Sequence, residues 1–100
     1  SFSTIEGAYS AWSIKTSSDH PYTASHKDQL IINSASAFTV TLPSSPSAEN
    51  TVIICNAGAG TVTVGRNSSN INSAAEDGSL PQGNSVQLVY VDSTIGWFEI

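Results

Sequence analysis

Hydrophobic and polar residues alternate along most of this chain with the two-residue period of β-strands, and no segment keeps a helical period beyond a turn or two. The clearest alternation is AFTVTLP (37–43), which places Phe38, Val40 and Leu42 on one face of a strand and threonines on the other. TVIICNA (51–57) is apolar on both faces, which is typical of a central strand. The same reasoning predicts strands at 8–16, 28–34, 61–65, 85–92 and 95–100.

Turn-forming residues separate these strands. LPSSPSAEN (42–50) is predicted to be a loop, NAGAG (56–60) a tight hairpin turn, SLPQGNS (79–85) a turn and DST (92–94) the hairpin turn before the last strand. Short strands at this spacing predict an all-β fold, a small β-sandwich or jelly-roll-like domain of about seven strands. The beginning of the chain is less regular, so we divide it into an N-terminal arm with an edge strand (1–18) and a sandwich domain (19–100).

Length and charge narrow the possible functions. One hundred residues make a single domain with a thin core, which favours support from a partner chain. Charged residues are 11% of the chain and the net charge is -5, which argues against binding nucleic acid or an anionic membrane surface. No apolar run approaches the ~20 residues of a membrane span, and the first residues lack the pattern of a signal peptide. Ser1 favours a complete mature protein over a fragment, and the fragment alternative stays open.

The sequence contains no convincing catalytic or metal-binding pattern. Cys55 is the single cysteine and lies in an apolar strand, so we expect a buried, inert thiol. His20 and His26 lie in a loop-like stretch with Asp19 and Asp28, at a spacing that matches no closed zinc site. We therefore predict that the protein is not an enzyme and needs no metal or cofactor.

Aromatic residues are the better candidates for contacts. Trp97 and Phe98 are adjacent in a predicted strand, so one of them must face away from the core. A subunit contact is the favoured explanation, and stacking on a sugar is the alternative. The candidate residues for assembly or ligand contact are Trp12, Tyr22, Arg66, Trp97 and Phe98.

The polar stretch VGRNSSNINSAAEDG (64–78) holds the chain's one arginine, Arg66. Its asparagines suit turns, and its one large apolar residue, Ile71, is expected to pin the loop to the core. The spacing from Ser73 to Glu76 allows a single helical turn. We expect Arg66 to pair with Glu76, with Asp77 or with an acidic group of the next subunit, and we interpret the stretch as architecture.

Several segments in this order resemble a small β-domain found in tail fibres and other virion proteins of tailed bacteriophages, including phages of cyanobacteria and marine bacteria. The segments that carry the resemblance are YTASHKDQLIIN (22–33), FTVTLP (38–43), TVII (51–54), VGRNSSNINSAAED (64–77) and VQLVYVDSTIGW (86–97). The resemblance covers 22–100. The sequence departs from the family pattern at Ser69 and Ser73, where glycine is common, at 56–57, and after Asp77, where Leu80 follows two places late.

The resemblance implies a non-enzymatic virion surface protein, a homotrimer of fibre-type domains that contacts other capsid or tail proteins and presents a surface to the host. A capsid decoration (cement) protein, anchored by the arm, is an alternative in the same class. A carbohydrate-binding module that takes a host surface glycan is an alternative from another class. The resemblance leaves open the host, the receptor and the choice between tail and capsid.

Overall fold

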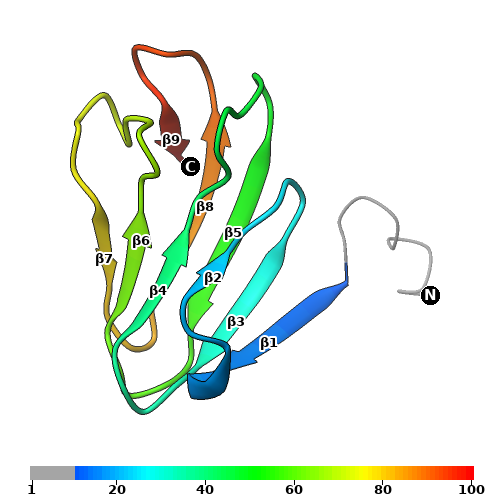
Figure 1. The fold of residues 1–100 in the computed structure, drawn as a ribbon, viewed down its shortest axis with the longest axis vertical. Helices are drawn as coiled ribbons and strands as arrows, with labels where there is room; N and C mark the ends of the chain where they lie inside the picture. The colour runs from blue at the N-terminus through cyan, green and yellow to red at the C-terminus, as the bar shows by residue number, and fades with distance from the viewer. Residues whose placement is uncertain (1–10) are drawn as a thin grey trace.

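The computed structural model describes residues 11–100, and over that range the chain is built from β-strands in two sheets (Figure 1). The all-β prediction is confirmed. The strands number nine where about seven were expected, because β2 and β7 have two and three residues, too few to show an alternation in the sequence. A single 3-10 turn, η2 (Ser17–Asp19), is the one helical element in the described range. The strands are β1 (Trp12–Thr16), β2 (Tyr22–Thr23), β3 (Gln29–Asn33), β4 (Phe38–Thr41), β5 (Thr51–Asn56), β6 (Val62–Gly65), β7 (Gly78–Leu80), β8 (Ser85–Tyr90) and β9 (Trp97–Glu99).

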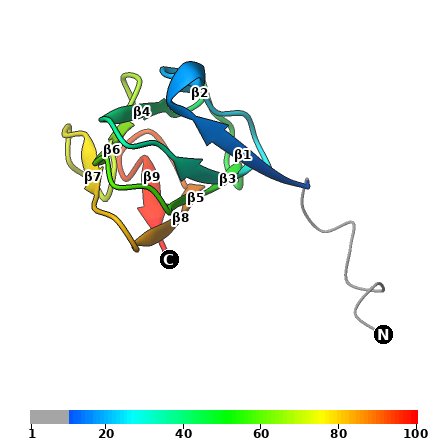
Figure 2. The same ribbon diagram turned by 90° about the horizontal axis from the view of Figure 1, so that it is seen from below.

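The two sheets face each other as layers (Figure 2), with five strands in the order β1-β3-β5-β8-β9 and four in the order β2-β4-β6-β7. From β1 to β6 the chain changes sheet at every strand, and neighbours within each sheet are parallel. The chain therefore coils like a short solenoid of three turns, each turn giving one strand to each sheet. The last strands then pair antiparallel and close that end. This connectivity differs from the antiparallel pairing of a jelly roll.

The core lies between the two sheets and follows the alternation of the strands. In β4, Phe38 and Val40 point inward, and in β9 Trp97 is fully buried while its neighbour Phe98 is 48% exposed. The ring of Tyr90 packs edge-on against Trp97 with centroids 5.5 Å apart. The fully buried side chains with the largest volumes are Trp97, Phe38, Leu30, Ile32, Leu42, Ile54, Leu88, Val40, Val52 and Val62.

The prediction of a hairpin turn at 56–60 is wrong, because β5 and β6 lie in different sheets and the segment is a corner of the solenoid. The N–H of Gly58 donates to the carbonyl of Ile32 (3.1 Å), and that of Gly60 donates to the carbonyl of Ser34 (2.8 Å). A Cβ on Gly58 would collide with the backbone of Ser34, and one on Gly60 with the carbonyl of Ser36. Glycine is needed here for close stacking of one corner on the preceding one.

A buried asparagine ties this corner to the turn that follows β7. Asn56 is 2% exposed, and its amide nitrogen donates to the carbonyls of Gly60 (2.9 Å) and Leu80 (2.8 Å). Its side-chain oxygen accepts the N–H of Gly58 (3.1 Å), and its backbone carbonyl accepts the N–H of Gly83 (2.8 Å). One polar side chain thus connects both sheets at the closed end of the coil.

The polar stretch 64–78 is held by its own hydrogen bonds. The helical turn expected at 73–76 is absent: Asn72 and Ser73 have φ of 49° and 67°, and Ile71 and Ala74 exchange two backbone hydrogen bonds around them. Positive φ at both central residues is the geometry of a tight hairpin turn, which competes with a helix.

The guanidinium of Arg66 does not pair with the carboxylate of Glu76 or Asp77, as was expected, but bonds to a backbone carbonyl. The guanidinium donates to the carbonyl of Ser69 (3.0 Å), while the Asp77 carboxylate accepts the backbone N–H of Arg66 (2.9 Å). The amide of Asn67 donates to the carbonyl of Leu42 (2.9 Å), and that of Asn70 to the carbonyl of Thr94 (2.9 Å). These contacts support the interpretation of the stretch as architecture.

Candidate functional site: the outer face of the five-stranded sheet

The two sheets present different surfaces to the outside. On the four-stranded sheet the outward positions are hydroxyl-bearing residues, in paired rows across the strands. Thr39 lies beside Thr63, and Thr63 beside Ser79, while Thr23 lies beside Thr41. Such a surface is well solvated, as is usual for the outer face of a sandwich.

The five-stranded sheet carries apolar side chains on its outer face, interleaved with polar ones. The polar residues at its outward positions are Thr16, Gln29, Asn33, Thr51, Ser85 and Gln87. The register places Ile14 beside Ile31 and Ile31 beside Cys55, and it places Val89 beside Phe98. Ile100 follows β9 and donates its N–H to the carbonyl of Gln87, which extends the sheet by one residue. We call this surface the apolar face, and its residues are Trp12, Ile14, Ile31, Ile53, Cys55, Val89, Phe98 and Ile100.

The apolar side chains with the greatest exposure lie at the two lateral edges of this face. On β1, Trp12 is 53% and Ile14 64% exposed, and beside β8, Phe98 is 48% and Ile100 66% exposed. The two aromatic rings alone leave on the order of 200 Å² in water, taking ~150–250 Å² for a whole aromatic side chain. This exposed apolar area is divided between the two edges, so each edge is a separate candidate contact surface.

At the first turn of the coil, the side chains of Lys15, Tyr22 and Asp28 form a polar layer, which we call the polar end layer. Lys15 is on the inward side of edge strand β1, and its ammonium lies 4.2 Å from the ring centroid of Tyr22. The Tyr22 hydroxyl donates to the Asp28 carboxylate (3.2 Å), and burial, followed by the charge and hydrogen bond of Asp28, raises the pKa of Tyr22. An inward-pointing charge on an edge strand disfavours pairing with another strand. Lys15 therefore disfavours the addition of another strand to the edge of β1.

The five candidate contact residues separate into four environments. Trp12 and Phe98 lie on the apolar face, at opposite edges of the same sheet. Tyr22 belongs to the polar end layer and Arg66 to the loop after β6. Trp97 is in the core, where its indole Nε1 has no hydrogen-bond partner among the described residues.

The histidines have structural tasks that the sequence pattern did not reveal. Nδ1 of His20 accepts the N–H of Thr39 (3.0 Å), and Nδ1 of His26 accepts the N–H of Thr51 (3.0 Å). Each imidazole thereby joins one turn of the coil to the next. Across residues 11–100, no three His, Cys, Asp or Glu side chains gather into a potential metal site. Within the same range, no helix has the length and apolar character to cross a membrane.

The expectation of a buried Cys55 is wrong. Its side chain is half-buried, on the outward side of β5 beside Ile31. The cause is that β5 is apolar on both faces, so the sequence pattern alone could not tell its inward from its outward positions.

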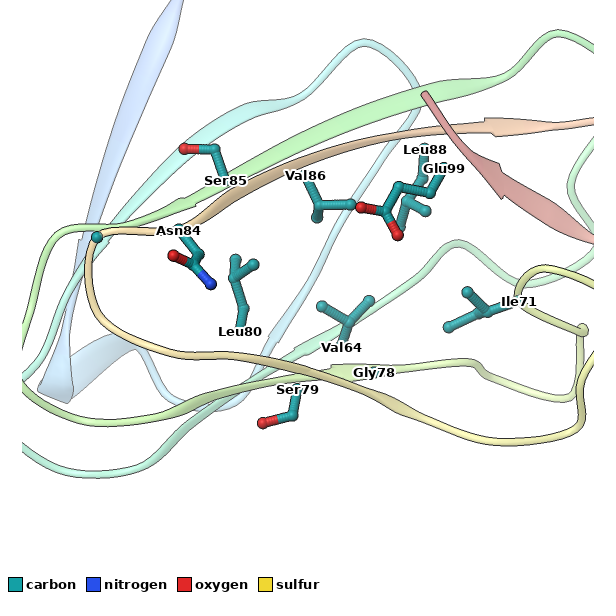
Figure 3. A pocket seen from close by; sticks show the side chains of 11 residues that line it. Val64, Ile71, Gly78, Ser79, Leu80, Asn84, Ser85, Val86, Leu88 and Glu99 are labelled. Atoms are coloured by element: carbon teal, nitrogen blue, oxygen red, sulfur yellow. The ribbon is translucent and has the colours of Figure 1, made fainter.

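A pocket of about 530 Å³ opens between the strands β6–β7 of one sheet and β8–β9 of the other (Figure 3). Aliphatic side chains line its interior, and the Glu99 carboxylate extends over Val86 from β9. Among the described residues that line the pocket, Glu99 is the only ionisable one. The sequence analysis missed Glu99, although its position two residues after Trp97 places it on the same side of β9 as Trp97, where it is exposed at the mouth of the pocket. The aliphatic lining residues are Val64, Ile71, Leu80, Val86 and Leu88.

Comparisons with known proteins identify the fold but no family. No family model and no curated protein matches the chain. Among solved structures, the chain is similar to one described as "Structure of a chaperone-substrate complex", with a TM-score of 0.58 and 15% sequence identity. The match covers 78% of this chain and 13% of the other, so this chain spans a small part of that protein's length. At this identity the likeness shows a shared fold.

Proposed function

We propose that this chain is a non-enzymatic structural domain of a tailed-phage virion surface that assembles as a homotrimer through the apolar face. The observation that carries the proposal is the contrast between the two outer surfaces: hydroxyl-bearing residues occupy the outward positions of one sheet, whereas the other exposes isoleucine and aromatic side chains at both of its edges, among polar residues. A monomer gains nothing from exposing the second surface, whereas an assembly buries it.

A second copy is the occupant that best fits the shape of this face. Its most exposed side chains lie at both lateral edges, with Trp12 and Ile14 on one side and Phe98 and Ile100 on the other. When three such sheets turn toward a common axis, the β1 side of each copy meets the β9 side of the next. Each copy then contributes two different edges to the contact, which is how a closed ring of heterologous interfaces forms.

The resemblance of 22–100 to phage virion domains supports placing this assembly on the virion surface. The low charge and the hydroxyl-covered outer sheet suit a surface that faces water while the apolar face is covered. The same assembly would serve in a tail fibre or as a decoration of the capsid.

The test is the solution mass of the full chain, measured by light scattering over a range of protein concentrations. We expect three times 10.4 kDa for the natural sequence. Ile14→Lys places a charge on the apolar face and should give a monomer. Thr23→Lys is the matched control, since Thr23 is exposed on the edge strand of the other sheet. It should leave the trimer intact.

Two results would contradict the proposal. A natural protein that stays monomeric at all concentrations would remove the assembly role and leave sugar stacking on Trp12 and Phe98 as the better explanation of the face. An oligomer that survives Ile14→Lys would show that association uses another surface.

A further inference from the structure

Glu99 is exposed at the mouth of the pocket, and no cationic side chain of the described residues lines the pocket beside its carboxylate. The backbone N–H of Glu99 donates to the side-chain oxygen of Asn72 (3.0 Å), which fixes the strand, but the carboxylate makes no hydrogen bond or ion pair among residues 11–100. None of the chain's three cationic residues lines the pocket. The pocket combines five aliphatic side chains with polar residues and one carboxylate at its mouth, which is complementary to an aliphatic stem that ends in a cation.

Lys27 is the one cation of this chain whose charge is not already engaged within the described residues. The ammonium of Lys15 lies over the ring of Tyr22, and the guanidinium of Arg66 donates to Ser69. Lys27 is exposed at the corner before β3, with a φ of 74°, and its ammonium has no hydrogen bond or ion pair across residues 11–100. Its side chain supplies four methylene groups and a terminal charge, which is the chemistry that the pocket lacks.

The strand register places Lys27 and Glu99 at nearly the same height along the five-stranded sheet. The N–H of Lys27 donates to the carbonyl of Thr51 (2.7 Å), Thr51 pairs with Val89, and Val89 pairs with Phe98, the residue before Glu99. The two charged residues are nevertheless separated across the width of the sheet, because β5 and β8 lie between β3 and β9. They are too far apart across the sheet to pair within one copy, since three strand spacings of ~4.8 Å separate them.

We propose that Lys27 of one copy enters the pocket of the next copy and pairs there with Glu99. Rotation about an axis along the strands leaves heights unchanged, so each Lys27 meets the Glu99 of its neighbour without a shift along the axis. The lysine stem packs on Val86 and Leu88 while the ammonium reaches the carboxylate at the mouth. This inference rests on the proposed homo-oligomer and adds the contact that sets its direction, because an apolar face alone does not specify which edges meet.

Charge reversal tests the pair directly. Lys27→Glu, Glu99→Lys and the double variant would be compared with the natural full chain by measuring the dissociation constant of the oligomer in a dilution series. We expect each single reversal to weaken association at least about tenfold, and the double reversal to return it to within about threefold of the natural protein. Glu76→Lys, which changes an exposed carboxylate outside the pocket, is the control and should change association by less than about threefold.

The outcomes separate this inference from the proposed function. If Ile14→Lys dissociates the oligomer while both single reversals associate like the natural protein, the pair is refuted and the apolar face stands. Failure of the double reversal to recover the loss seen in the singles would also refute the pair. A natural chain that is monomeric throughout would overturn both. Far-UV circular dichroism of each variant confirms that the exposed substitutions leave the fold intact.

Discussion

Replacing Asn56 should destabilise the fold more than any other single polar substitution in the corner after β5. The side chain is 2% exposed and makes three hydrogen bonds, two from its amide nitrogen and one to its oxygen. Asn56→Leu keeps much of the volume and removes the hydrogen bonds, whereas Asn56→Ala also leaves a cavity. Comparison of the two variants separates the polar contribution from the packing contribution.

The size of the effect follows from the groups left without partners. The N–H of Gly58 loses one of its two acceptors and keeps the carbonyl of Ile32, and the carbonyls of Gly60 and Leu80 each lose a donor. An unpaired buried backbone group costs about 1–3 kcal/mol, so we expect the Leu variant to lose about 2–4 kcal/mol of unfolding free energy. The cavity in the Ala variant should add about 1 kcal/mol. Domains of this size have about 5–15 kcal/mol in total, so either loss is large.

Guanidinium unfolding, followed by far-UV circular dichroism and by fluorescence of the buried Trp97, measures these losses. All variants must be compared at one protein concentration, because association would stabilise the folded state. Asn33→Ala is the control, since Asn33 is exposed at the end of β3, and its change should stay within about 0.5 kcal/mol. An Asn56→Leu variant within about 1 kcal/mol of the natural protein would refute the reasoning.

Two further predictions concern Gly60, in the corner after β5, and the phenol of Tyr22. Gly60→Ala should destabilise the fold strongly because its Cβ would meet the carbonyl of Ser36. Gly83→Ala, which has open space around its Cβ and a φ of 86°, should cost only about 1–2 kcal/mol of unfolding free energy. Equal losses of stability in thermal unfolding of the two variants would contradict the close-stacking account. The folded state raises the pKa of Tyr22 above its ordinary 10.0, so the protonated phenol is favoured on folding. This contribution is complete below pH 10 and is lost as the pH rises through the folded pKa. Tyr22→Phe should therefore show a smaller fall in stability above pH 10, and an unchanged fall would exclude Tyr22 as its source.

The strands could be predicted from the sequence, but their partners could not. The alternation in 37–43 correctly separates inward Phe38 and Val40 from outward threonines, because period two is a local property of the backbone. Parallel pairing between successive turns depends on contacts such as the stacking of Gly60 on Ser34, which join residues far apart in the sequence. Glycines in NAGAG suit a hairpin and a close corner equally, so the sequence did not distinguish between them.

The candidate surface was partly predictable. Adjacent Trp97 and Phe98 require one outward aromatic, and the doubly apolar β5 implies that one outer face carries apolar side chains. The sequence could not place Ile14 beside Ile31, which follows from the parallel register, or Lys15 over Tyr22, which follows from the facing of the two sheets. Glu99 and Lys27 are single charged residues without a motif, and their equal height became evident only from the pairing of β5, β8 and β9.

The most direct test of assembly through the apolar face uses its own cysteine as a reporter. Cys55 is the only cysteine of the chain, and it lies on that face beside Ile31. The measurement is the rate at which a maleimide reagent labels this thiol as the protein concentration is raised. We expect the rate to fall as the oligomer forms, and to stay constant for Ile14→Lys. A rate that is independent of concentration while light scattering reports an oligomer would place the interface elsewhere and contradict the account.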